Sequence, residues 1–168
     1  MRSRRSGGIL LETALWMPFL ILLFMGTVEL SRITYTYYTL KKILYTVART
    51  VGTQQGVNFC NDADTNVAAI KAAAVTGNAE GTGDPLLPRL TAELIAVRIE
   101  RFSADSGTLS ECTCEASATG CDTAGGARGP DYVVVTVPDG YAVTLRIPGL
   151  ANDPIPLRPH VRLPFGGT

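Results

Sequence analysis

The apolar residues of this chain are concentrated in one run near the N-terminus. Residues 8–28 read GILLETALWMPFLILLFMGTV, and Glu12 is the only charged residue in the run. As an α-helix, a run of this length spans about 30 Å, the thickness of the hydrocarbon core of a bilayer. The apolar part of a secretory signal is shorter, at about 7–15 residues. The run therefore predicts a transmembrane helix.

After residue 28 the apolar positions recur at alternating steps of three and four residues. This spacing places them on one face of an α-helix, and Gly52 is a residue type that commonly ends a helix. The pattern predicts one helix over residues 8–52, which leaves the membrane and continues as a stalk. Contact with the chain's own domain and contact with helices of partner proteins would both explain the pattern. The residues of this predicted packing stripe are Leu30, Ile33, Tyr37, Leu40, Leu44, Val47 and Val51.

Residues 53–168 have the shorter patterns of a small folded domain. Asp64 or Thr65 can cap the start of a short helix over residues 66–75, and Gly77 can end it. Apolar and polar residues then alternate in several segments, as they do in half-buried strands. The predicted strands are residues 94–102, 132–137, 141–147 and 161–163. The predicted fold class is α+β, with a long N-terminal transmembrane helix followed by a small antiparallel β-sheet.

Turn residues add detail to the strand prediction. Pro138, Asp139 and Gly140 separate two of the predicted strands, and this composition favours a hairpin. The last predicted strand lies between Pro159 and Pro164. Since proline cannot donate a hydrogen bond to a neighbouring strand, we expect this strand at an edge of the sheet.

The net charge is zero, but the charges are divided unevenly. Residues 1–56 carry seven lysines and arginines against two acidic residues, whereas residues 57–168 carry eight against thirteen. Basic residues before an apolar run keep that end in the cytoplasm, so we expect the domain on the opposite side of the membrane. An acidic domain argues against a nucleic-acid partner, which would require a basic surface.

Glu12 is the residue in the apolar run that most needs an explanation. A carboxylate about one turn into a membrane span costs a few kcal/mol, so it either lies at the headgroup boundary or has a partner. Cleavage between Gly7 and Gly8 would create an amino group on Gly8 and make Glu12 the fifth residue of the mature chain. Glu12 could then pair with the amino terminus of a neighbouring subunit.

Gly7, Glu12, Pro18, Gly26, Glu29 and Arg32 form a pattern along the N-terminal part of the chain. This pattern resembles the TadE-like minor pilins of tight-adherence (Flp, type IV) pilus systems. The resemblance covers roughly residues 4–52. It implies a pilin-like fold, residues 1–7 as a leader that a prepilin peptidase removes after Gly7, and a residue at position 12 that pairs subunits.

The implied function is that of a minor pilin, or pseudopilin, in the assembly or priming of a pilus. Such a protein acts by protein–protein contacts and is not an enzyme. Its implied partners are the prepilin peptidase, other pilins, the inner-membrane assembly platform and the lipid bilayer, and it could itself enter the extracellular pilus. Thr13 stands where major pilins of this class favour tyrosine, which favours a minor role.

The four cysteines lie in the exported part of the chain, where disulfides can form. A bridge between Cys112 and Cys114 would strain its geometry, which leaves Cys60 paired with Cys112, Cys114 or Cys121. Their spacing matches no compact zinc site, so we expect no metal or cofactor. Residues 112–129 are then a disulfide-bearing surface loop.

Two other functions remain open at this level. The cysteine loop could serve adhesion or ligand binding at a pilus tip. A membrane-anchored periplasmic enzyme or sensor is the weaker alternative, because His160, the sole histidine, has no serine, cysteine or acidic residue in a catalytic pattern near it.

Overall fold

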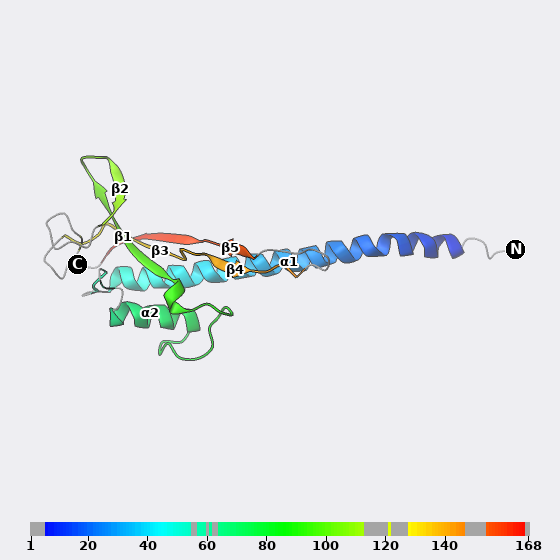
Figure 1. The fold of residues 1–168 in the computed structure, drawn as a ribbon, viewed down its shortest axis with the longest axis horizontal. Coiled ribbons are helices and arrows are strands. Elements are labelled where there is room, and N and C mark those ends of the chain that lie inside the picture. The colour runs from blue at the N-terminus through cyan, green and yellow to red at the C-terminus, as the bar shows by residue number, and fades with distance from the viewer. Residues whose placement is uncertain are drawn as a thin grey trace.

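The computed structural model describes residues 6–54, 57–59, 61, 64–112, 121, 128–146 and 154–166. One long helix extends from a small domain, and the domain packs around the C-terminal half of that helix (Figure 1). The elements are α1 (Ser6–Thr53), α2 (Thr65–Thr76), the 3-10 helix η1 (Ala92–Leu94), β1 (Ala96–Ser103), β2 (Thr108–Glu111), β3 (Tyr132–Thr136), β4 (Tyr141–Val143), β5 (Ile155–Leu157) and β6 (His160–Pro164).

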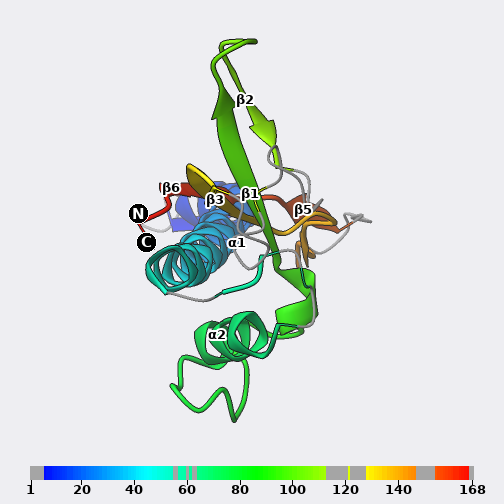
Figure 2. The ribbon, with the colours of Figure 1, turned by 90° about the vertical axis from the view of Figure 1, so that its left-hand side faces the viewer.

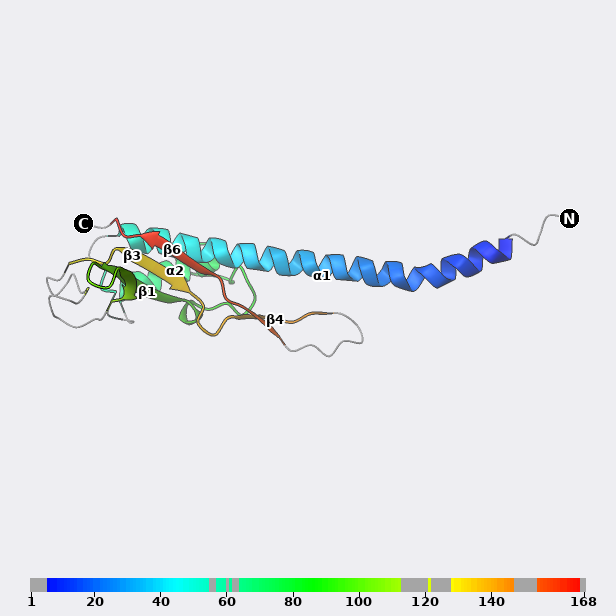
Figure 3. The same ribbon diagram turned by 90° about the horizontal axis from the view of Figure 1, so that it is seen from above.

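Helix α1 has 48 residues and ends at Thr53, one residue beyond the predicted stop. Among the described residues, α1 is the one helix that is long and apolar enough to cross a membrane. The segment that meets this criterion is Gly8–Thr53. Pro18 lies inside the helix, where it removes one backbone hydrogen bond. Figure 3 shows α1 bending in its blue N-terminal part, as a proline inside a helix allows.

Two antiparallel sheets form the rest of the domain. The larger has four strands in the order β2-β1-β3-β6, and the smaller consists of β4 and β5. In the larger sheet β1 pairs with β3 from Ala96↔Thr136 to Glu100↔Tyr132. The predicted α+β class, a long helix followed by a small antiparallel sheet, is confirmed. The last predicted strand is also found at an edge, as β6.

The predicted hairpin of residues 132–137 and 141–147 is wrong. The turn between them exists, since the Gly140 N–H donates to the Val137 carbonyl at 3.0 Å and Gly140 has a φ of 78°. However, β4 pairs with β5, with Val143 opposite Ile155. Both sides of β3 are occupied, by β1 and by β6, so the chain after the turn cannot return beside it.

The core lies where α1 crosses the four-stranded sheet. Figure 2 shows the C-terminal half of α1 between this sheet and α2. Leu44 and Val47 of α1 and Val133 and Val135 of β3 are fully buried in one apolar cluster. Burying a large aliphatic side chain contributes about 1.5–3 kcal/mol, so this cluster holds the domain to the helix.

The predicted packing stripe divides into two parts. Leu40, Leu44, Val47 and Val51 are fully buried in the core, whereas Ile33 is half-buried. Nearer the apolar run, Leu30 is 65% exposed and Tyr37 is 36% exposed. The stripe is therefore fully buried at its distal end. Because Glu29 and Ile33 are also shielded, Leu30 and Tyr37 lie at the edge of the covered face.

Helix α2 begins and ends at the predicted signals. One oxygen of the Asp64 carboxylate accepts from the N–H groups of Asn66 at 2.8 Å and Val67 at 3.3 Å, and the other accepts from the Asn58 N–H at 3.1 Å. Gly77 ends the helix with a φ of 72°. Asp64 therefore ties the start of α2 to the segment that precedes it.

These contacts predict a dependence of stability on pH. The Asn58 N–H, above all, and the N–H groups of Val67 and Asn66 lower the pKa of Asp64 below its ordinary value of 3.8. A lowered folded-state pKa gives stability that is complete above the unfolded pKa and is lost as pH falls through the folded one. We expect Asp64→Asn to have a lower Tm than wild type at neutral pH, and the difference to shrink in acid. A Tm difference that stays constant across this range would contradict the prediction.

Candidate functional site

The N-terminal half of α1 projects away from the domain as a bare apolar rod (Figures 1 and 3). Except for Met25, which is half-buried, its large apolar side chains are more than half exposed, and they surround the helix on all sides. Such a surface requires cover from lipid or from other protein helices. The exposed residues are Ile9, Leu10, Leu11, Leu15, Trp16, Met17, Phe19, Leu20, Ile21, Leu22, Leu23, Phe24 and Val28.

Glu12 is the one acidic side chain on this rod. It is exposed, and no ion pair within the described part of the chain involves it. Gly7 and Gly8 lie in the first turn of α1, one turn before Glu12. The neighbouring Thr13 hydroxyl donates to the Ile9 carbonyl at 2.8 Å within its own helix. The Glu12 carboxylate is therefore available to a partner outside the described part of the chain.

A polar junction marks the point where the rod meets the domain. Glu29 is only 9% exposed, and its carboxylate lies 3.5 Å from the Arg32 guanidinium one turn later. The same guanidinium donates to the backbone carbonyl of Thr144, just after β4. Arg32 thus joins the base of the rod to the smaller sheet.

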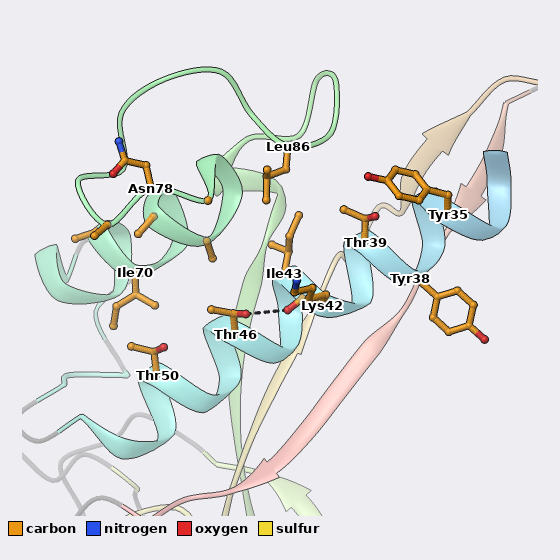
Figure 4. Close-up of a pocket in the computed structure, with 15 residues that line it drawn as sticks. Tyr35, Tyr38, Thr39, Lys42, Ile43, Thr46, Thr50, Ile70, Asn78 and Leu86 are labelled. Carbon is orange, nitrogen blue, oxygen red and sulfur yellow. Dashed lines mark hydrogen bonds between the residues drawn. The ribbon is translucent and has the colours of Figure 1, made fainter. Parts of the chain in front are cut away.

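A groove runs along the distal half of α1, with α2 as its other wall (Figure 4). Its volume is about 1010 Å³. Tyr35, Tyr38 and Thr46 line it from α1, and the small side chain of Ala73 lines it from α2. Lys42 is the one charged side chain among the described residues that line it. With apolar, hydroxyl and small side chains, the groove suits contact with another chain more than chemistry on a substrate.

The cysteines are only partly within the described residues. Cys112 and Cys121 form a disulfide with their Cα atoms 5.8 Å apart, and Cys121 is buried. Cys60 and Cys114 lie outside the described residues, as does most of the predicted loop over residues 112–129. Among the residues that the structure describes, no group of three or more metal-ligating side chains comes together.

The segment that contains the rod is similar to a known protein family. Residues 7–49 match the family model described as TadE-like protein. This segment resembles TadE-like proteins. The match confirms the resemblance seen in the sequence, and it covers most of α1, including the rod, Glu12 and the polar junction. Proteins of the TadE-like family are structural components in the assembly of tight-adherence pili. No curated protein and no solved structure matches the chain significantly.

Two features of the TadE-like segment were not predicted from sequence. Arg32 was recognised at the exit of the rod, but its partner is a backbone carbonyl 112 positions later, which leaves no trace in residue types. The groove was also missed. The small residues Ala69, Ala73 and Ala74 of α2 were a signal for it, since small side chains let another surface approach closely.

Proposed function

We propose that this chain is a minor pilin that takes part in assembling or priming a tight-adherence pilus. A prepilin peptidase removes residues 1–7, residues 8–28 hold the mature chain in the inner membrane, and the domain stands on the periplasmic side. The observation that carries the proposal is the rod: an exposed apolar helix with a single carboxylate, lying within the TadE-like match.

Either lipid or the helices of other pilins can cover the apolar surface of the rod. In the bilayer its side chains contact lipid, and in a fibre they would contact the helices of other pilins. Because lipid chains and helix surfaces are similarly apolar, the exchange is close to balanced for these side chains. Packing and polar contacts between subunits then decide whether the helix leaves the bilayer. The chain can thus be stable as a membrane protein and still be transferred.

Removal of the leader changes the charge at the N-terminal end of the rod. The leader carries Arg2, Arg4 and Arg5, which would oppose transfer through the apolar membrane core. Its removal leaves one amino group, on Gly8, and one carboxylate, on Glu12. In apolar surroundings the Glu12 carboxylate of one subunit and the terminal amino group of a neighbour satisfy each other. The other pilins and the inner-membrane assembly platform are the partners that this arrangement requires.

The processing step gives the first test. In cells with an active prepilin peptidase, mass analysis of the membrane-extracted protein should find a chain that begins at Gly8. In cells without the enzyme the leader should remain. Gly7→Leu should also retain the leader, because a bulky side chain then occupies the cleavage position. Gly26→Ala is the matched control, since an added Cβ at Gly26 meets no atom within 4 Å and should leave cleavage unchanged. A chain that keeps Met1 in both kinds of cell would refute the processing step.

A further inference from the structure

The face of α1 that is turned toward the domain remains partly buried beyond the core. Glu29 is buried, Ile33 is half-buried, and Met25 and Gly26 are half-buried as well. These positions follow each other at helical spacing, so they form one face. Every other residue of 8–28 is exposed. The shielded face therefore extends from the core into the last turn of the apolar rod.

The smaller sheet lies along this face. We call β4 with its continuation, Tyr141–Arg146, together with Pro154–Leu157, the β4–β5 arm. Figures 1 and 3 show this arm beside α1, extending from the larger sheet toward the N-terminal half of the helix. The bond from Arg32 to the Thr144 carbonyl fixes the arm to the base of the rod.

The helical rise of α1 indicates how far the β4–β5 arm stands from the hydrocarbon core of a bilayer. If the hydrocarbon core ends near Val28, Arg32 lies about 6 Å beyond it, at about 1.5 Å per residue. The headgroup layer on each side of the core is roughly 5–8 Å thick. With α1 upright in the bilayer, Thr144, which Arg32 contacts, is therefore expected near the level of the headgroups.

The arm has side chains that suit this layer. Arg146 lies two residues beyond Thr144, is exposed, and forms no ion pair with any residue that the structure describes. Its planar guanidinium can hold a phosphate oxygen with two hydrogen bonds. Ile155, opposite Val143 in the arm, is 40% exposed. A cation and an exposed apolar side chain on the same arm suit the boundary between phosphates and acyl chains.

We propose that the β4–β5 arm rests on the membrane surface and that Arg146 binds the headgroups of anionic phospholipids. The inference depends on the membrane anchoring that forms part of the proposed function. The arm would hold the domain in one orientation while the chain is in the membrane. It would have to release the lipid when the subunit is withdrawn into a pilus.

Spin labels on the full-length protein in nanodiscs test the proposal. Ile155→Cys places a label on the arm, and Leu109→Cys on β2 is the matched control, since Leu109 is also a strand residue and is 37% exposed. A label on Leu22→Cys reports whether the rod is in the bilayer. We expect the label at 155 to be protected from a water-soluble relaxing agent, and more so when phosphatidylglycerol is added to phosphatidylcholine. The label at 109 should be equally accessible in both lipids.

Two further variants isolate the arginine. Arg146→Gln should abolish the additional protection that phosphatidylglycerol gives to the label at 155, while Arg158→Gln, at an exposed arginine on the domain side of β5, should not. Equal accessibility at 155 and 109 with a buried label at 22 would overturn the inference and leave the anchoring intact. An exposed label at 22 would overturn the anchoring. Protection at 155 only when other pilus proteins are present would assign the arm to a protein partner and overturn the lipid assignment.

Discussion

Replacing Leu44 by alanine is expected to lower the free energy of unfolding of the domain by about 2–5 kcal/mol. Leu44 is fully buried where α1 crosses the four-stranded sheet, in the same cluster as Val133 and Val135. Its removal deletes apolar contacts and leaves a cavity that rigid strands on one side and α2 on the other cannot fill. Since small domains are stable by only about 5–15 kcal/mol, the loss would be a large part of the total.

Leu30→Ala is the matched control for this substitution. Both leucines are on α1 and on the predicted packing stripe, but Leu30 is 65% exposed. Its replacement should change the stability by no more than about 0.5 kcal/mol. Denaturant unfolding of the full chain in detergent micelles, followed by near-ultraviolet circular dichroism, compares the two. Equal losses would mean that α1 is held to the domain by something other than the core around Leu44.

The contrast between Leu44 and Leu30 also indicates what periodicity can and cannot predict. The spacing of the apolar residues correctly predicted that they share one face of α1. It also predicted the helix itself from residue 8 onward. It could not say which positions of that face the domain would cover, because both the exposed Leu30 and the buried Leu44 satisfy the same pattern. That division depends on where the sheet lies, which is a property of the tertiary fold.

The strands that were missed had weak sequence signals for a physical reason. All four residues of β2 are exposed, so the strand has no apolar side to produce an alternation. It is held by backbone pairing to β1, with Phe102 opposite Leu109. β5 is only three residues long and contains Pro156. Proline weakens a strand prediction, although it is tolerated at an edge.

The sequence predicted those parts of the candidate site that consecutive residues form. The rod, the single carboxylate on it and the neighbouring glycines can all be recognised from consecutive residues. The polar junction, the groove and the β4–β5 arm each combine α1 with segments far along the chain, such as Thr144 and Ala73. No local pattern specifies such a pairing, so the structure was needed to find these features.

The largest effect on assembly is expected from Glu12→Gln. A hydrogen bond to a charged group contributes about 1.5–3 kcal/mol, so loss of the carboxylate's charge should weaken subunit pairing by roughly 10- to 100-fold. We expect the number of pili per cell, counted by electron microscopy, to fall accordingly. Cleavage after Gly7 must first be verified by mass, so that a failure of processing is not mistaken for a failure of pairing.

Two other variants make this result specific to the charge of Glu12. Glu12→Asp keeps the carboxylate and should restore part of the assembly, although its shorter side chain reaches less far. Thr13→Val alters the next residue, whose hydroxyl is already bonded to Ile9 in its own helix, and should assemble as wild type does. Normal numbers of pili with Glu12→Gln would indicate that the carboxylate simply lies among headgroups. The rod would then associate through its apolar surface alone, and the amino group on Gly8 would need another partner.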